Sequence, residues 1–244
     1  MAKNFRLYVK DTLTIGKTFT LTEEQTHYLK DVVKFNFTDS IFCFDNISGE
    51  FLCEVTEQTK KQITLRAIKQ TKQFYACPDI WLLFCPLKKD KTDFVIEKAT
   101  ELGCAKIIPT LSQYTNCTNI KTERYIAQSI EAAEQCRRTD LPDITPPQKL
   151  TDILKTWDIS RTLYFMDETM KSASFLDLLQ HETTHKAAIL VGPEGGFSEQ
   201  ELNLLRNLSF AKGATLGPRI LRAETAVAAA MSCWQLIAGD WRTK

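Results

Sequence analysis

The spacing of hydrophobic positions changes near residue 80. Before it, short runs of β-branched and aromatic residues are separated by turn-forming pairs such as 45–46 and 48–49, which is typical of a β-rich domain. These runs are FRLYV, IFCFD, EFLCEV and QITLRAI. The stretch 22–33 has helical spacing instead, and Thr22 followed three residues later by Gln25 predicts a capping box at its start. We therefore expect a small β-barrel with one helix.

After the polar segment 70–79, apolar strands alternate with helices along the chain. Residues 80–87 form a continuous apolar run, as in a strand that is buried on both faces. Helices are expected at 90–103, where Gly103 would follow the last turn, and at 121–138. This alternation predicts an α/β fold with a mostly parallel sheet and right-handed crossovers.

Predicted strands and helices also alternate over the last hundred residues. Ser198 and Glu201 predict a second capping box at the start of a helix, and residues 224–239 predict a final helix that is apolar nearly all round and therefore buried. We expect two domains, one at residues 1–72 and one at residues 73–244.

Composition narrows the class of protein without naming it. With 43% hydrophobic and 25% charged residues, the chain is of the ordinary globular type. The net charge of +1 gives no bulk signal for a nucleic-acid partner, although a local basic patch stays possible. None of the eight cysteines forms a C-x-x-C pair, which argues against a zinc ribbon or redox motif. No run is long enough for a membrane span and residues 1–12 do not form a signal peptide, so we expect a cytoplasmic protein.

A glycine-rich loop, GPEGGFS at 192–198, follows an apolar strand and suggests a ligand site. It lacks the lysine of a P-loop, and its glycines do not have the spacing of a dinucleotide motif. A second Gly-Pro loop at 216–222 also follows a predicted strand, so both loops should meet at the carboxyl edge of the sheet. Their backbone groups suit a flat polar edge such as adenine, and Glu194 and Glu224 favour a cationic ligand. Two tight turns without a ligand remain the alternative.

The two loop sequences closely resemble the C-terminal motifs of the ribosomal RNA small-subunit methyltransferase E family, a member of the SPOUT class. The segments on which this resemblance rests are GPEGGFS at 192–198 and LGPRILRAETA at 216–226. The resemblance continues through PLKKDKTDFVIEKATELGCAKIIP at 86–109, EAAEQCRRTDLPDITPP at 131–147, and the N-terminal FRLYV and HYLKDVV. It covers nearly the whole chain in the family's order.

This resemblance implies a fold, a cofactor and a substrate. The C-terminal domain would be a SPOUT-type α/β trefoil knot that binds S-adenosylmethionine, and the N-terminal domain a PUA-like β-barrel that helps to bind RNA. The enzyme would methylate N3 of one uridine of 16S ribosomal RNA, uridine 1498 in the family's usual RNA numbering, as a homodimer without a metal. Lys34 and the pair Thr115 and Asn116 depart from the family pattern, which affects expected RNA contacts and not the cofactor loops.

The resemblance also implies site residues. For cofactor binding these are Leu190, Gly192, Pro193, Glu194, Gly195, Gly196, Leu216, Gly217, Ile220, Leu221 and Thr225. For RNA binding they are Arg6, Lys30, Lys34, Lys88, Lys89, Lys91, Gln135 and Arg138. Arg222 is expected to stabilise charge on the uridine oxygens or to hold the target phosphate, with Glu194 or Glu224 as the proton acceptor. The carboxylate of Glu224 could instead serve only as a favourable charge at a helix start.

Two other functions compete with methyl transfer. The pentapeptide HETTH at 181–185 spells the H-E-x-x-H zinc-hydrolase motif, but it falls where a helix ends and a strand begins, so we interpret it as a connection. A non-catalytic RNA-binding protein with the same fold is the second alternative, and the intact glycine loops argue against it. From the sequence alone, Gly195→Val is expected to abolish cofactor binding.

Overall fold

The computed structural model describes residues 4–36, 39–59, 61–117, 120–181 and 186–242. Contacts group the chain into two compact units, Met1–Ala76 with Ala133–Leu141, and Cys77–Ala132 with Pro142–Lys244. The segment Ala133–Leu141 from the middle of the chain therefore belongs with the first unit. A single boundary in the sequence cannot describe such a division. The division into domains at 1–72 and 73–244 stays a prediction.

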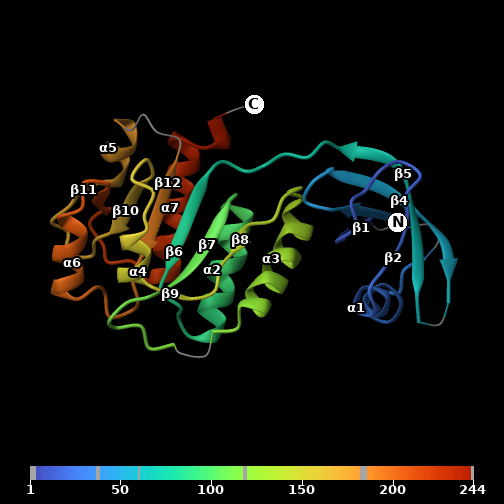
Figure 1. Ribbon diagram of the computed structural model, residues 1–244, viewed down its shortest axis with the longest axis horizontal. Coiled ribbons are helices and arrows are strands. Elements are labelled where there is room, and N and C mark those ends of the chain that lie inside the picture. The colour runs from blue at the N-terminus through green and yellow to red at the C-terminus, as the bar shows by residue number, and fades with distance from the viewer. Residues whose placement is uncertain (1–3, 37–38, 60, 118–119, 182–185, 243–244) are drawn as a thin grey trace. The chain divides into compact units, whose positions relative to one another are not determined.

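The first unit is built on a five-stranded sheet. Its strands are β1 (Asn4–Tyr8), β2 (Thr18–Thr20), β3 (Ser40–Phe44), β4 (Glu50–Gln58) and β5 (Ile63–Lys72). They follow the order β1-β3-β4-β5-β2, in which only the β1–β3 pairing is parallel (Figure 1). Apolar side chains such as Leu7, Ile41 and Leu65 point inward from alternate positions and form the core of this unit.

The helix of the first unit begins as expected and then changes its hydrogen bonding. In α1 (Glu23–His27), Thr22 and Gln25 form the predicted capping box. The chain continues as a π-helical turn, η1 (Tyr28–Val32), rather than as a regular helix to residue 33. Hydrophobic periodicity cannot reveal this change, because one wider turn still keeps Leu29 in the core.

The second unit is organised around an eight-stranded sheet in which every pairing is parallel. Its strands are β6 (Ile80–Phe84), β7 (Lys106–Leu111), β8 (Asp143–Ile144), β9 (Gln148–Lys149), β10 (Thr162–Met166), β11 (Ala173–Ser174), β12 (Ala187–Val191) and β13 (Ala211–Thr215). The order is β11-β13-β10-β12-β6-β7-β8, with β9 attached to β7. The predicted α/β class with a mostly parallel sheet is confirmed. The trefoil knot stays a prediction.

Helices cover both faces of this sheet (Figure 1). They are α2 (Lys89–Glu101), α3 (Thr122–Cys136), α4 (Leu150–Lys155), α5 (Phe175–Gln180), α6 (Glu199–Arg206) and α7 (Ala223–Ile237), followed by the 3₁₀ turn η2 (Asp240–Arg242). Side chains of α2, α5 and α7 share one core cluster, and those of α4 and α6 share the cluster on the other face. The sequence pattern did not predict α4, which is too short to show periodicity.

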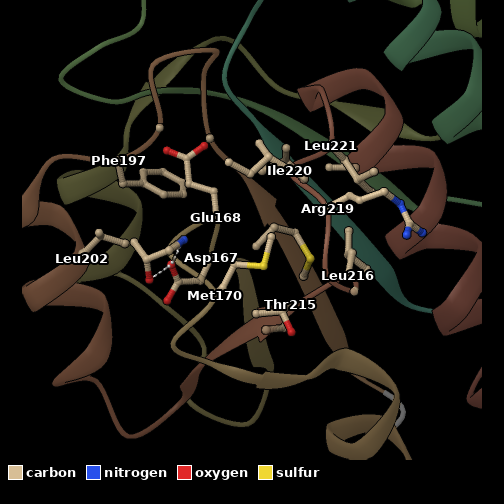
Figure 2. A pocket seen from close by; sticks show the side chains of 18 of the residues that line it. Asp167, Glu168, Met170, Phe197, Leu202, Thr215, Leu216, Arg219, Ile220 and Leu221 are labelled. Atoms are coloured by element: carbon tan, nitrogen blue, oxygen red, sulfur yellow. Dashed lines mark hydrogen bonds between the residues drawn. The ribbon is translucent and has the colours of Figure 1, made fainter.

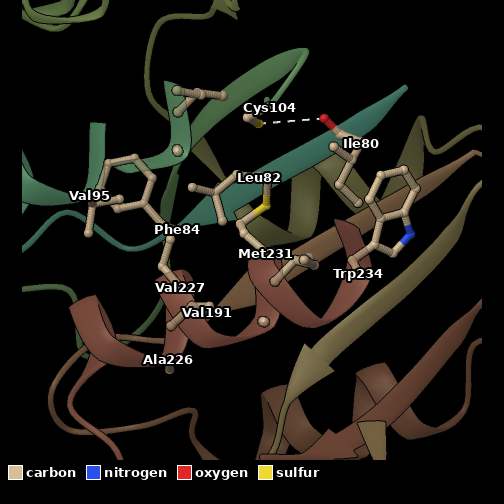
Figure 3. Close-up of a cluster of buried hydrophobic side chains, with 14 of the residues drawn as sticks. Ile80, Leu82, Phe84, Val95, Cys104, Val191, Ala226, Val227, Met231 and Trp234 are labelled. Carbon is tan, nitrogen blue, oxygen red and sulfur yellow. Dashed lines mark hydrogen bonds between the residues drawn. The ribbon is translucent and has the colours of Figure 1, made fainter. Parts of the chain in front are cut away.

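Successive side chains of the central strands point to opposite faces of the sheet, and both faces are buried, which explains why the sequences of these strands are apolar throughout. In β6, Leu82 packs on the α7 side and Leu83 on the α6 side, and both are fully buried. Met231 and Trp234 of α7 close the first cluster (Figure 3). The outer face of α7 is less buried than expected, since Leu236 is 57% exposed. Among the described helices, none has both the length and the apolar character needed to cross a membrane.

The sheet order places three loops side by side. Strands β13, β10 and β12 are neighbours and run in the same direction, so the loops that leave their carboxyl ends meet at one edge. The loop after β12 is GPEGGF, and it ends at the predicted capping box of Ser198 and Glu201 at the start of α6. The loop after β13 leads into α7, whose N-cap is Arg222.

Candidate functional site

A cavity of about 250 Å³ opens at this edge of the sheet. Its walls come from all three loops and from the ends of the strands that precede them (Figure 2). Val191, Phe197 and Leu216 supply apolar surface, while glycine residues leave backbone groups uncovered. A flat ligand with an apolar face and a polar edge fits such a lining.

The cavity gathers most of the residues that the sequence assigned to the cofactor. These are Gly192, Pro193, Gly196, Leu216, Gly217, Ile220 and Leu221. The other four lie elsewhere. Leu190 is fully buried in the core beneath, Glu194 lines a neighbouring cavity, and Gly195 and Thr225 are exposed. Their roles in cofactor binding stay predictions.

Adjacent glycines of the loop have different conformations. Gly196 has φ +69°, the left-handed region that disfavours side chains, and a Cβ there would overlap the carboxylate of Glu168. Gly195 does not have a positive φ, and a Cβ there would meet Tyr114 at an ordinary 3.6 Å. The position at which a side chain would disturb the cavity is therefore Gly196, and the structure gives no reason for Gly195→Val to abolish binding.

Sequence reasoning missed the third loop, which follows β10. Asp167 (Figure 2) begins it. Its buried carboxylate accepts hydrogen bonds from the backbone N–H of Thr169 at 2.9 Å and from the hydroxyls of Thr169 and Ser172, each at 2.7 Å. Arg206 of α6 adds an ion pair at 3.1 Å. The loops after strands next to β12 reach the same edge of the sheet, but the sequence does not show that β10 is such a strand.

These bonds change the ionisation of Asp167. Burial alone would raise the pKa of the carboxyl group, but the hydrogen bonds from Ser172, Thr169 and Arg206 outweigh it and lower the pKa to about 2. A depressed pKa means that the ionised group stabilises the fold above its ordinary pKa of 3.8 and that this contribution is lost as the pH falls towards 2.

We expect Asp167→Asn to lower the free energy of unfolding by about 2 kcal/mol near neutral pH, because the charge that holds the loop is lost. The difference from the wild type should shrink at about pH 3, where the wild-type contribution is itself fading. Urea unfolding at the two pH values measures both quantities. The adjacent Glu168→Gln is the control for stability, since its exposed side chain has no hydrogen-bond partner among the residues described. A difference that does not change with pH would contradict this account.

A second cavity adjoins the first and is lined by charged groups. Lys91, Glu194 and Arg222 face it, with Ala223 behind them. The residues common to both cavities are Glu168, Pro193, Ile220 and Leu221. The two cavities therefore meet along a shared boundary. All three residues expected to take part in catalysis lie at or near the second cavity rather than inside the first.

Lys91, at the start of α2, organises these charges. It pairs with Glu194 and lies 4.0 Å from Oε1 of Glu224. The hydrogen bond from Lys91 lowers the pKa of Glu194, so this exposed carboxylate stays ionised at neutral pH. Oε2 of Glu224 is buried and has no hydrogen-bond partner within the described part of the chain. The ammonium group of Lys91 is thus paired with two carboxylates in the structure. The RNA contacts expected of Lys91 and of the exposed Lys88 and Lys89 stay predictions.

Several predicted RNA contacts belong to the first unit and have structural partners there. Arg6 is 9% exposed and donates to Glu50 and to the carbonyls of Ala133 and Arg138. Arg138 is itself paired with Asp140 at 2.9 Å. Arg6 therefore joins the segment 133–141 to the sheet, whereas the Arg138 side chain is paired within that segment. A role of either arginine in RNA binding stays a prediction.

The remaining predicted contacts differ in exposure. Lys30 donates to the carbonyl of Thr59 at 3.0 Å. Lys34 is exposed, in a left-handed conformation with φ 52°. Gln135 lines a polar cavity within the first unit, beside Phe5 and Lys72. The RNA contacts expected of Lys30, Lys34 and Gln135 stay predictions.

The HETTH segment lies largely outside the described residues, which exclude 182–185. Its first residue, His181, ends α5 and donates through Nδ1 to the carbonyl of Asp177 at 2.7 Å. Among the side chains that the structure describes, no group of three or more His, Cys, Asp or Glu residues could hold a metal ion.

Comparison with known proteins identifies both units. The sequence profile of a family described as "RNA methyltransferase domain" matches residues 75–235, and that of an "RNA methyltransferase PUA domain" matches residues 21–68. Together with the parallel sheet and its edge cavity, these matches define an RNA methyltransferase with an N-terminal PUA domain. The predicted PUA-like domain is confirmed.

Relatives and solved structures specify the family. The chain is 31% identical to the ribosomal RNA small subunit methyltransferase E of Rickettsia conorii, covering 95% of each protein. It is 32% identical to that of Buchnera aphidicola subsp. Schizaphis graminum, covering 96% of this chain and 97% of the relative. The Neisseria gonorrhoeae enzyme bound to S-adenosyl methionine aligns with a TM-score of 0.86 at 26% identity, over 97% of this chain and 99% of that one. The chain belongs to the ribosomal RNA small subunit methyltransferase E family.

A further solved structure has the same fold. A methyltransferase from Legionella pneumophila, in complex with the bound cofactor SAM, aligns with a TM-score of 0.87 at 25% identity, over 98% of this chain and all of that one. The family resemblance inferred from the two loop motifs is therefore confirmed.

Proposed function

We propose that this protein transfers a methyl group from S-adenosylmethionine to N3 of one uridine, uridine 1498 by the family's numbering, in 16S ribosomal RNA. The observation that carries the proposal is the pair of adjoining cavities. One has the glycine-rich, partly apolar lining that suits a nucleoside, and the other has the charges that suit a reacting base. Family membership supports both assignments.

The residues of the first cavity fit the cofactor. Glycines at 192, 196 and 217 let a ligand approach the backbone, and no lysine lines the cavity to attract phosphate. Asp167, Glu168 and Glu199 line the cavity with one arginine, Arg219, and because Asp167 is already paired with Arg206, two carboxylates remain against that arginine. This acidic excess favours a ligand that carries positive charge. S-adenosylmethionine, when bound, supplies an electrophilic methyl group on a positively charged sulfur.

The residues of the second cavity can assist loss of the N3 proton. Glu194, which pairs with Lys91, can accept a hydrogen bond from N3–H. Arg222 can stabilise the negative charge that develops on the uridine oxygens as the proton leaves. Glu224 is not among the residues that line the second cavity and lies 4.0 Å from Lys91, and we assign it to positioning that lysine.

The proposal includes the RNA partner and the oligomer. We propose that the PUA domain contributes RNA contacts and that the enzyme acts as a homodimer on the small ribosomal subunit. Phosphate contacts of this kind would make RNA affinity fall as salt rises. Sedimentation of the purified protein across a concentration series measures its oligomeric state, and a single monomeric species would refute the dimer.

Methyl transfer by the purified protein tests the proposal. The protein is incubated with labelled S-adenosylmethionine and small subunits that lack the modification, and the nucleosides of the RNA are then separated. We expect label in N3-methyluridine from 16S RNA. Label in another nucleoside would refute the base assignment. Tight cofactor binding without any transfer would favour a non-catalytic RNA-binding protein.

A further inference from the structure

One charged residue lies where the two cavities meet. Of the four residues that line both, Pro193, Ile220 and Leu221 are apolar, and only Glu168 carries charge. In Figure 2 its carboxylate lies between the side chains of Phe197 and Ile220. It makes no hydrogen bond or ion pair with any residue that the structure describes, although Lys91 and Arg222 face the second cavity. Its charge is therefore not neutralised by a neighbouring cation.

The glycine-rich loop creates the space for this carboxylate. A Cβ at Gly196 would overlap Oε1 of Glu168, and only glycine adopts the left-handed backbone there without strain. The neighbouring Asp167 holds the start of the loop that carries Glu168, which follows β10, through its bonds to Thr169 and Ser172. Two separate features of the fold thus direct Glu168 towards the boundary between the cavities.

The proposed reaction places a particular atom at this boundary. If the nucleoside occupies the first cavity and the uridine the second, the methyl group has to cross where the cavities meet, and the sulfur that carries it lies beside that crossing. This sulfur is positively charged before transfer. Afterwards the electron pair of the broken carbon–sulfur bond stays on sulfur, which becomes a neutral thioether. The new bond forms at N3, and the N3 proton passes to Glu194.

We propose that Glu168 selects the charged cofactor over its neutral product. A carboxylate beside the sulfur attracts S-adenosylmethionine and has no charge to attract on the sulfur of S-adenosylhomocysteine. The residue would thus favour exchange of product for fresh cofactor after each turnover. Because the attraction weakens as the charge leaves the sulfur, it stabilises the bound cofactor more than the transition state, so it favours binding and does not accelerate the transfer. This inference rests on the proposed function.

Binding measurements separate this role from a general effect of charge. Calorimetry is carried out on the full chain with S-adenosylmethionine and with S-adenosylhomocysteine, for the wild type, Glu168→Gln and Glu199→Gln. Glu199 is the matched control because it is an exposed carboxylate that lines the first cavity and not the second. Unchanged melting temperatures establish that the variants fold.

We expect Glu168→Gln to reduce the preference for the charged cofactor by about fivefold, an effect limited by exposure to solvent. Glu199→Gln should reduce this preference much less, because Glu199 lines the first cavity away from the boundary with the second. If Glu168→Gln weakens both ligands by the same factor, or neither, the inference is overturned while the proposed function stands. If the wild type binds neither ligand, the proposed function fails and the inference with it.

Discussion

Replacing Gly196 with valine should reduce affinity for S-adenosylmethionine by about 100-fold, or about 2.7 kcal/mol. Gly196 has φ +69°, where a β-branched residue is strained, and its missing side chain leaves room beside Glu168 in the first cavity. The Glu168 side chain can move away, so most of the loss comes from a distorted loop and a partly filled cavity. Calorimetry with the purified variant measures its affinity for S-adenosylmethionine.

The adjacent glycine provides the control for this prediction. Gly195→Val adds the same side chain at an exposed position with no left-handed backbone, where the Cβ would meet Tyr114 at 3.6 Å. We expect its cofactor affinity to stay within about threefold of the wild type, which corresponds to a change of less than about 1 kcal/mol in binding free energy. If Gly195→Val abolished binding and Gly196→Val did not, the cavity would be wrongly assigned.

Removal of the Arg222 guanidinium should reduce kcat for methyl transfer by about 100-fold to 1000-fold, the usual cost of losing a group that stabilises developing charge. Arg222 is the N-cap of α7, and its exposed side chain lines the second cavity. The substitution leaves the first cavity intact, so cofactor affinity should change little. Single-turnover measurements with Arg222→Ala, together with calorimetry, separate the two effects.

Arg219→Ala is the matched variant for this experiment. It removes a guanidinium from the same loop, but Arg219 lines the first cavity and not the second. We expect its effect to appear mainly in cofactor affinity, with a much smaller change in kcat. Equal losses of kcat in the two variants would indicate a general effect of loop charge and contradict the role assigned to Arg222.

The sequence was informative wherever local chemistry determines structure. The capping boxes at Thr22 and Ser198 and the left-handed Gly103 after α2 are set by a few neighbouring residues, and all three are present. The two loop motifs were specific enough to indicate the family, because glycine and proline positions reflect backbone geometry that few folds require.

What the sequence did not show depends on contacts between distant residues. The Asp167 loop reaches the cavity because β10 lies between β12 and β13, and this strand order cannot be read from hydrophobic spacing. Lys91 has the sequence of a surface cation, yet its partners Glu194 and Glu224 lie more than a hundred residues away. Likewise, the burial of Arg6 depends on the segment around Arg138. Such pairings are fixed by the fold as a whole.

Mass spectrometry of 16S ribosomal RNA from a strain that lacks this protein tests the central claim most directly. The account predicts that N3-methyluridine disappears from one position of the RNA in that strain. It should return when the wild-type protein is supplied, and return to a much smaller extent when the Arg222→Ala variant is supplied at equal abundance. Persistence of N3-methyluridine in the deletion strain would contradict the account.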